Sequence, residues 1–393
     1  MPAERLARFV LLPELNLVGQ QKLGEATNIY FAEKQKVPCE ICPRCATPSS
    51  VYYDKRTITI RDEPLRGSHV LLKITKHRYY CKTCRKPFTE PISGIMPKRR
   101  TTQRYRRSLL WACENFSDLS KVKRAYRCSS ALLYKILFEQ LELKLREYQY
   151  PWPQKIGIDE HFFSRSKGYR EFATVFTDMN RKRVKEIVLG KSNLALEEQL
   201  AHISGRENVR LVALDLSDGY KVFVKNYFPN AELVADKFHV LRLLTPHIFR
   251  RRREITKTNA SSKAKRLLLM SSKNLDYFDK RALLDYLKQY PELAELYHWK
   301  ESLHGFYRIK GYRRAQTAFF HMTNSMATSQ LPEVKTLRRT LLRWEREILN
   351  YFKTRLTNAR TEGFNNVAKL VQKRAYGYKN FRNYRLRLLS ACA

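Results

Sequence analysis

Three acidic residues stand at positions where carboxylates could hold metal ions. Asp159 ends the apolar run IGID, Asp215 ends the apolar run LVALD, and Glu362 opens a helical pattern in the segment TEGFNN. Magnesium prefers hard oxygen ligands, and two magnesium ions held by carboxylates polarise a phosphate and activate a water or hydroxyl that attacks it. These residues therefore predict a site that cuts or joins phosphodiesters.

The second acid has two candidates. Asp218 lies three residues after Asp215 and opens the segment DGY, but Asp215 is favoured because it directly ends an apolar run. Asp178 is expected in a hairpin turn. Glu160 should face away from Asp159, because successive side chains of a strand alternate between its two faces.

The whole chain is strongly basic. It carries 76 Lys and Arg against 37 Asp and Glu, a formal net charge of +39 over 393 residues. Since Lys and Arg release condensed counterions from phosphates, this charge predicts a nucleic-acid partner. A hydrophobic fraction of 43% excludes a disordered basic tail. We expect no membrane partner and no secretory signal, because no apolar run approaches ~20 residues and no small-residue cleavage site follows the first apolar segment.

Two cysteine pairs have the spacing of metal ligands. Cys42 and Cys45 form one C-x-x-C, and Cys81 and Cys84 form a second. Four thiolates satisfy tetrahedral zinc and leave no position open for water, so the pattern predicts a zinc ribbon whose ion is structural. Cys39, three residues before Cys42, is an alternative ligand. We expect a reducing, cytoplasmic location, because the chain shows no secretory signal.

The segment 116–138 has the pattern of a helix-turn-helix. Asp118 or Ser120 can cap a first short helix, and Ser129 or Ser130 can cap a second. In such a motif the second helix reads DNA in the major groove. Basic residues along the segment are the expected DNA contacts: Lys121, Lys123, Arg124, Arg127 and Lys135.

The segment 151–240 must position the first two acids. Three successive strand patterns are followed by alternating helix and strand patterns, which fits a mixed sheet covered by helices. In a sheet of that order the first and fourth strands are neighbours, so the strand ends carrying Asp159 and Asp215 should lie together. Beyond the predicted sheet, residues 241–356 read as almost wholly helical, and 357–393 as one helix with a basic face.

Three stretches resemble one known family. GIDEHFFSR, PNAELVADKFHV and TEGFNNVAKLVQKRAYGYKNFRNYRLR are similar to insertion-sequence transposases of the ISL-three type, which carry a DDE catalytic domain on a ribonuclease-H-like fold. The resemblance covers nearly the whole chain and implies a multi-domain α+β protein. We expect the chain to divide into five parts. The first two are an N-terminal zinc-binding domain (1–95) and a helix-turn-helix domain (96–150). The others are the first part of a ribonuclease-H-like α/β domain (151–240), an all-α insertion (241–356) and a C-terminal helix with the third acid (357–393).

The resemblance also implies residue roles. Asp159, Asp215 and Glu362 become the catalytic acids that bind two magnesium ions, for which manganese can substitute. Asp236 and His239 resemble a D-x-x-H element that orients the scissile phosphate or braces the site. Trp299 is a candidate for stacking on a flipped base, although a core tryptophan is the more common case.

On the last predicted helix, Glu362, Asn365, Lys369 and Lys373 share one face, because they lie at i, i+3, i+7 and i+11. With Arg374, the two lysines are expected DNA contacts, the alternative being a solvated basic face.

The predicted function is a DNA transposase that binds terminal inverted repeats and performs cleavage and strand transfer. Its partners would be double-stranded DNA and at least one further copy of the chain, in the bacterial cytoplasm at the nucleoid. Two alternatives differ in class: a domesticated transposase acting as a non-catalytic DNA-binding regulator, and a structure-specific nuclease of the same fold.

Overall fold

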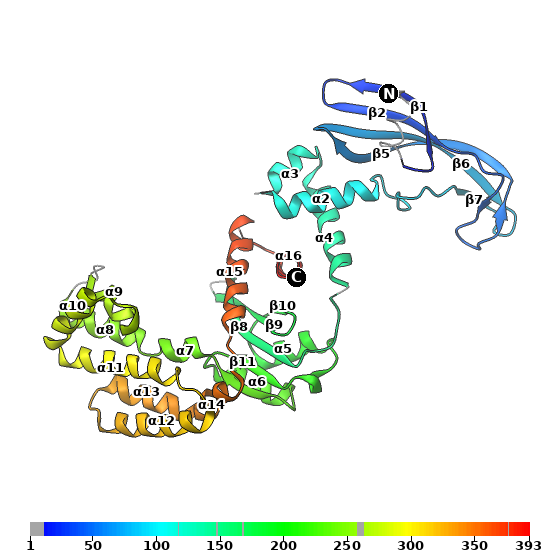
Figure 1. Ribbon diagram of the computed structural model, residues 1–393. Coiled ribbons are helices and arrows are strands. Elements are labelled where there is room, and N and C mark those ends of the chain that lie inside the picture. The colour runs from blue at the N-terminus through cyan, green and yellow to red at the C-terminus, as the bar shows by residue number, and fades with distance from the viewer. Residues whose placement is uncertain (1–11, 117, 147, 167–168, 258–262, 376) are drawn as a thin grey trace. The chain divides into compact units, whose positions relative to one another are not determined.

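A computed structural model describes residues 12–116, 118–146, 148–166, 169–257, 263–375 and 377–393 (Figure 1). The chain divides into two compact units, Met1–Arg146 and Glu147–Ala393. The five-part division expected from the sequence is finer than this and stays a prediction. The sequence also indicates a short lead-in with one apolar segment over residues 1–35, of which residues 1–11 lie outside the described residues.

The first unit contains a five-stranded sheet in which β1, β2, β6 and β5 are neighbours in that order and β7 pairs with β6. One face is covered by the core residues Ile60, Leu72 and Ile74. The bounds of its strands, with the two-stranded sheet of β3 and β4, are β1 Leu15–Leu23, β2 Thr27–Lys34, β3 Glu40–Ile41, β4 Pro48–Ser49, β5 Tyr52–Leu65, β6 Ser68–Cys81 and β7 Lys86–Thr89.

The strands β1 and β2 differ from the expectation of a short lead-in. They form an antiparallel pair, and β2 runs parallel to β6. The reason lies in the alternation of their side chains, which buries Leu15, Tyr30 and Ala32 against the sheet's core while the intervening residues are more exposed.

Three helices end the first unit: α2 Gln103–Asn115, α3 Leu119–Ala125 and α4 Ser130–Arg146. Asp118 caps α3 by accepting a hydrogen bond from the backbone N–H of Lys121 at 2.8 Å. Ser129 accepts one from Leu132 N–H at 3.2 Å at the start of α4. Between them Arg127 has a φ of 41°, which makes the turn tight. The two predicted helices and their caps are therefore present.

The second unit contains a five-stranded sheet in the order β10-β9-β8-β11-β12. β8, β9 and β10 are antiparallel neighbours, while β8, β11 and β12 run parallel. The first and fourth strands of this unit are thus adjacent, as the sequence predicted. The strand bounds are β8 Lys155–Ser166, β9 Tyr169–Asp178, β10 Arg183–Leu189, β11 Leu211–Leu214 and β12 Glu232–Ala235.

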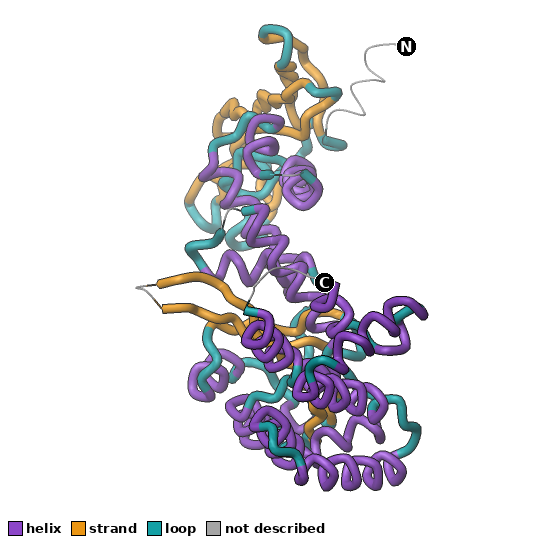
Figure 2. Tube along the Cα trace, turned by 90° about the vertical axis from the view of Figure 1, so that its left-hand side faces the viewer, coloured by secondary structure: helices purple, strands orange, loops and turns teal. Residues whose placement is uncertain are grey.

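The strand β8 does not end at Asp159, where the sequence placed its end. Its pairing with β11 stops at Gly157, but its pairing with β9 continues to Ser166. Figure 2 shows this hairpin running beyond the sheet. The strand continues because the residues after Asp159 still alternate, with Phe163 buried. Asp159 therefore lies where β8 separates from β11.

Helices cover both faces of this sheet. Ile156 and Ile158 face α5 Asn193–Leu200 and α6 Asp218–Tyr227, since they share one core cluster with them. The other face meets α15 Ala359–Arg374 and α16 Phe381–Ala391. The predicted single C-terminal helix is thus two helices. Gly377, with a φ of 95°, lies between them, and Asn380 caps α16.

Between β12 and α15 the described residues form only helices. Their bounds are α7 Lys237–Arg242, α8 Thr245–Thr256, α9 Lys263–Leu269, α10 Tyr277–Lys288, α11 Pro291–Phe306, α12 Tyr312–Ser325, α13 Pro332–Arg343 and α14 Glu345–Thr354, with the short turns Ser272–Asn274 and Met326–Thr328 and a further one, Arg206–Asn208, ahead of β11. None of the described helices is long and apolar enough to cross a membrane.

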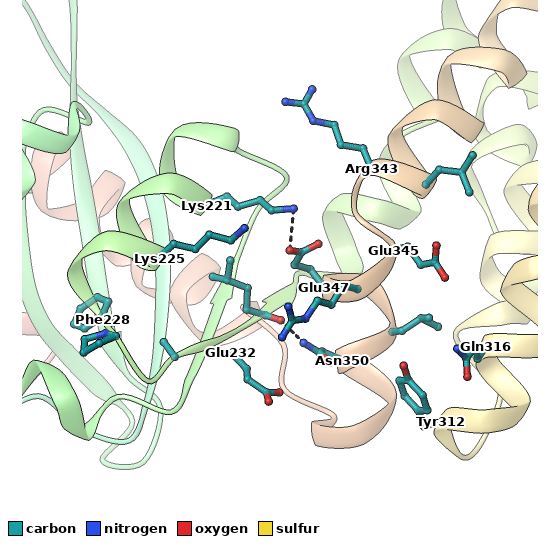
Figure 3. A pocket seen from close by; sticks show the side chains of 16 residues that line it. Lys221, Lys225, Phe228, Glu232, Tyr312, Gln316, Arg343, Glu345, Glu347 and Asn350 are labelled. Carbon is teal, nitrogen blue, oxygen red and sulfur yellow. Dashed lines mark hydrogen bonds and ion pairs between the residues drawn. The ribbon is translucent and has the colours of Figure 1, made fainter.

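A polar cavity of about 600 Å³ separates α6 from α12, α13 and α14 (Figure 3). Lys221 reaches Glu347 across it at 2.8 Å, and the Asn350 amide donates to the carbonyl oxygen of Leu233 at 3.0 Å. The first contact attaches α14 to α6, and the second attaches α14 to β12. The acids singled out in the sequence do not line this cavity.

Candidate metal centres and nucleic-acid surfaces

The four predicted zinc ligands converge. The sulfur atoms of Cys42, Cys45, Cys81 and Cys84 all lie within 4.8 Å of one another. Cys45 Sγ and Cys81 Sγ are 3.6 Å apart, and Cys42 Sγ and Cys84 Sγ are 4.0 Å apart. Zinc with bonds of ~2.3 Å to four sulfurs separates those sulfurs by ~3.8 Å, so the cluster fits a tetrahedral zinc ion.

Local contacts shift the pKa values of these cysteines in both directions. The first pair lies between β3 and β4, and the second lies where β6, which ends at Cys81, turns into β7; there Cys84 N–H donates to Cys81 Sγ at 3.4 Å. Hydrogen bonding to Cys45, together with burial, raises the pKa of Cys84 to about 12. A hydrogen bond with Thr47 lowers the pKa of the Cys45 thiol to about 6. The backbone N–H of Arg44 lowers the pKa of Cys42. Cys39 is exposed and stands outside the converging group, which leaves the predicted four as the ligands that fit.

Asp159 lies where β8 separates from β11, and Asp215 directly follows the end of β11. Burial raises the pKa of Asp159 to about 6, and the negative charge of Asp215 adds to the effect. Burial likewise raises the pKa of Asp215, whose Oδ1 is buried and has no hydrogen-bond partner among the described residues. A cation would relieve both the crowding of charge and the unpartnered oxygen, so these carboxylates fit a divalent metal ion.

Helix α15 is held against this part of the sheet by two asparagines. The Asn365 amide donates to Asp159 Oδ2 at 2.8 Å. Asn358 donates through its side chain to the carbonyl oxygen of Ile158 at 2.8 Å, and its backbone N–H donates to Asp236 Oδ1 at 3.0 Å. The start of α15 is thereby fixed to both β8 and the end of β12.

Close approach of α15 depends on Gly157. A Cβ added there would lie 2.3 Å from Met179 Cε and 2.4 Å from both Asn358 Oδ1 and Thr361 Oγ1. Such distances are far inside van der Waals contact, so only glycine fits at this position. Because Gly157 has no side chain, the helix that carries Glu362 packs directly on β8 beside Asp159.

Asp236 and His239 form the hydrogen-bonded pair expected of a bracing element. His239 Nδ1 lies 3.0 Å from Asp236 Oδ2, and this contact raises the pKa of His239. Asp159 and Asp215 raise the pKa of His239 further, so the imidazole stands within electrostatic reach of both acids.

Glu362 is not gathered with the other acids. It occupies the first turn of α15, its side chain is 49% exposed, and its Oε1 lies 3.5 Å from Arg242 Nη1. Among the described residues, the cysteines form the only group of three or more His, Cys, Asp or Glu side chains close enough to hold one ion. The rival acid Asp218 is turned toward Arg343, at 2.7 Å.

The other acidic predictions fall where expected. Asp178 accepts hydrogen bonds from the N–H groups of Asn180 and Arg181 in the turn between β9 and β10. Glu160 lies on the face opposite Asp159 and accepts a hydrogen bond from the Tyr220 hydroxyl at 3.3 Å.

The predicted DNA-contacting lysines and arginines are exposed. In the first unit they lie on α3, the following turn and α4, and in the second unit on the C-terminal half of α15: Lys121, Lys123, Arg124, Arg127 and Lys135, and then Lys369, Lys373 and Arg374. Trp299 differs from them. It is 8% exposed within the core of the helical segment, and its indole N–H donates to Glu295 at 3.3 Å. Its burial favours a core role over base stacking.

Sequence reasoning missed Gly157, Asn358 and the amide contact of Asn365. A faint signal existed, because Gly157 interrupts an apolar strand pattern, and such a glycine marks a close backbone approach. No local signal identified Asn358, since Ile158 and Asp236, which its side chain and N–H contact, are distant in sequence.

Comparison with known proteins places both ends of the chain in one group. Residues 156–388 match the DDE transposase family of ISL3 type, described as "Transposase". Residues 32–84 match the zinc finger of the transposases of IS204, IS1001, IS1096 and IS1165. The chain is 25% identical over 386 residues to the transposase for insertion sequence element IS1001 of Bordetella parapertussis, an alignment that covers 94% of this chain and 92% of that protein.

Proposed function

Because the chain belongs to the ISL3-type family of transposases, we propose that it binds the terminal inverted repeats of an insertion sequence and catalyses magnesium-dependent cleavage and strand transfer of DNA. The observation that carries the catalytic part is the placement of Asp159 and Asp215. The carboxyl groups of Asp159, on β8, and of Asp215, directly after the neighbouring strand β11, both have raised pKa values. The helix packed on β8 holds Glu362 in its first turn.

The strand order supports a ribonuclease-H-like catalytic domain. Three antiparallel strands followed by two parallel strands on the far side of the first is the order expected for that fold. The helices α7 to α14 stand between the last strand and α15, where an all-α insertion would interrupt it.

In this proposal the three acids bind metal, and the bound ions supply Lewis-acid polarisation of the scissile phosphate and activation of the attacking water or 3′-hydroxyl. The Asp159 carboxylate is held before any ion arrives, because it accepts hydrogen bonds from Glu160 N–H and the Asn365 amide. Glu362 joins them by leaving Arg242, a contact that costs little to break because both side chains are about half exposed or more. Asp215 is preferred to Asp218 as the second acid, because its buried Oδ1 has no partner among the described residues and its charge acts on Asp159.

The pair of Asp236 and His239 would brace the catalytic arrangement. Asp236 ties α15 to the end of β12 through Asn358 N–H and also positions the His239 ring. A His239 imidazole whose pKa is raised toward the charged form offers a hydrogen-bond donor and positive charge beside the acids, which suits a phosphate group.

The first unit would recognise the element's ends. The zinc ribbon folds around its ion, and α3 and α4 present exposed basic residues in the manner of a helix-turn-helix. Lys369, Lys373 and Arg374 continue from Glu362 along α15 and would contact the backbone of the strand being cut. Joining two ends requires at least two copies of the chain.

The test is a nicking and strand-transfer assay on labelled DNA carrying the inverted repeats that flank the gene. We expect cleavage at the repeat ends in Mg²⁺ or Mn²⁺, none in EDTA, and none on DNA with scrambled ends. Asp159→Ala, Asp215→Ala and Glu362→Ala should each abolish cleavage and retain end binding.

Two outcomes would contradict the assignment. Full strand transfer by Asp215→Ala would exclude Asp215 as the second acid. Specific end binding by the native chain without any metal-dependent nicking would instead indicate a regulator.

A further inference from the structure

A row of buried polar side chains extends from Asp159 along the contact between β8 and the helices α15 and α16. Asn365 on α15 donates to Asp159 Oδ2 at 2.8 Å, and His161 on β8 and Tyr384 on α16 follow, with His161 Nε2 lying 2.5 Å from the Tyr384 hydroxyl. Their exposed fractions are 6%, 5% and 0%. Buried polar groups are retained only where hydrogen bonds satisfy them, so this row requires an explanation.

Two atoms in the row still need partners. Asn365 Oδ1 and His161 Nδ1 are both buried, and neither has a hydrogen bond among the described residues. Because the Asn365 amide nitrogen is committed to Asp159, its oxygen can only accept. A proton on His161 Nδ1 supplies the missing donor, so one bond between these two atoms would satisfy both.

That assignment orients every bond in the row. With the proton on Nδ1, His161 Nε2 must accept from the Tyr384 hydroxyl. The donors then run in one direction, from Tyr384 to His161, from His161 to Asn365, and from Asn365 to Asp159. The ring needs no charge for this arrangement, and no carboxylate of the described residues forms a hydrogen bond or ion pair with it.

Packing holds the far end of the row in place. The Tyr384 ring lies 5.1 Å from Phe163 and 5.8 Å from His161, centroid to centroid, and Phe163 also meets Phe381 at 5.3 Å. Since Phe163 follows His161 on the same face of β8, α16 is fixed relative to the strand that carries Asp159.

We propose that Tyr384 and His161 are positioning residues which, through Asn365, set the orientation of the Asp159 carboxylate for metal binding. This inference rests on the proposed function. Asp159 Oδ1 accepts a hydrogen bond from the backbone N–H of Glu160 at 2.8 Å, and Oδ2 accepts one from Asn365. Each oxygen keeps one lone pair free for a metal ion, and the two hydrogen bonds fix the orientation of the carboxylate. The C-terminal helix α16 thereby acts on the catalytic site through His161, Asn365 and Asp159.

The experiment measures Mn²⁺ binding to the full-length protein on uncleavable end DNA, from the loss of the free-ion electron paramagnetic resonance signal. Two substitutions of His161 separate its two nitrogens. His161→Asn places an amide near the Nδ1 position and keeps the donor to Asn365. His161→Gln places an amide near the Nε2 position and keeps only the partner of Tyr384.

Partners of metal ligands typically change affinity 10–100-fold when removed. We therefore expect His161→Gln to weaken Mn²⁺ binding about tenfold and His161→Asn to weaken it by about threefold or less. Tyr384→Phe removes only the hydroxyl and should weaken binding by about threefold. The matched control is Tyr286→Phe, which deletes a buried hydroxyl on α10 that makes no hydrogen bond among the described residues, and it should change nothing.

Equal Mn²⁺ affinity in Tyr384→Phe and Tyr286→Phe would overturn the proposal, as would His161→Gln binding as tightly as His161→Asn. Thermal unfolding of each variant shows whether it is folded, and Tyr384→Phe keeps the inference testable if the His161 variants are not. Failure of the proposed function looks different, because the native protein would then not cleave end DNA whatever the order of these affinities.

Discussion

The four cysteines and the three acids differ in how far the fold alone assembles them. The cysteine sulfurs all lie within 4.8 Å of one another, where the turn between β3 and β4 meets the turn between β6 and β7. Of the acids, Asp159 is buried and Asp215 is partly buried, with its charge acting on Asp159, whereas Glu362 is half exposed and paired with Arg242.

This difference separates a structural metal site from a catalytic one. Four sulfurs around one ion leave no open position, so such a site can only stabilise its module. Two neighbouring carboxylates with an outlying third leave room for substrate and a way to complete the site when DNA is bound. The excess of negative charge between Asp159 and Asp215 destabilises the metal-free protein and is what a divalent ion would remove.

The largest expected effect follows loss of the zinc site. Cys81→Ser should cost the first unit about 10 kcal/mol of metal-linked folding free energy, because structural zinc supplies folding free energy on that scale. The module should then be digested in limited proteolysis while residues 147–393 survive. Zinc content and specific end binding should both be lost, whereas Cys39→Ser should keep both. Retention of one zinc per chain by Cys81→Ser would contradict the four-cysteine assignment.

Removing charge from Asp159 should have the opposite effect on stability. The native pKa of about 6 lies above the ordinary value of 3.8, so the native state holds the extra proton between these values and stability falls as pH rises through that window. Asp159→Asn should therefore raise the free energy of unfolding at pH 7 by up to about 3 kcal/mol while abolishing cleavage.

The check for Asp159→Asn is chemical denaturation at pH 4, 6 and 8 without metal. The gain over the native protein should be near zero at pH 4 and largest at pH 8. Added Mn²⁺ should raise the melting temperature of the native protein more than that of the variant. A gain independent of pH would exclude the charge as its cause.

A third test concerns the approach of α15 to β8. Gly157→Ala forces a Cβ to within 2.4 Å of three side-chain atoms and should destabilise the second unit by about 1–3 kcal/mol. The control is Gly363→Ala on α15, where a Cβ would meet nothing within 4 Å, and this change should stabilise by about 0.5–1 kcal/mol. Equal melting temperatures for the two variants would show that the close contact is relaxed in solution.

The smallest effect is expected at Asp218. Its pair with Arg343 joins two side chains that are 50% and 64% exposed, and such surface pairs contribute about 0–1 kcal/mol. Asp218→Ala should therefore keep most stability and cleavage, in contrast to Asp215→Ala. Loss of cleavage in Asp218→Ala, measured in the same nicking assay, would reverse the choice between these two acids.

Local patterns predicted much of the fold. The adjacency of β8 and β11 followed from the order of strands and helices, and the caps Asp118 and Ser129 lie where hydroxyl and carboxylate side chains precede helical patterns. The predictions failed at the ends of elements, in both directions: one strand is longer than expected and one helix is interrupted. The strand β8 runs past Asp159 to Ser166, and the C-terminal segment breaks at Gly377 into two helices.

The sequence by itself determined the kinds of chemistry: four thiolates at zinc spacing, acids at the ends of apolar runs, and a charge of +39 that requires a polyanion. These are properties of residue type and local spacing. Only the tertiary structure decided which groups meet, since the contacts of Asn358 with Ile158 and of His161 with Tyr384 join residues 200 and 223 positions apart. Such contacts depend on burial and close packing of whole helices on a sheet, and no local pattern encodes them.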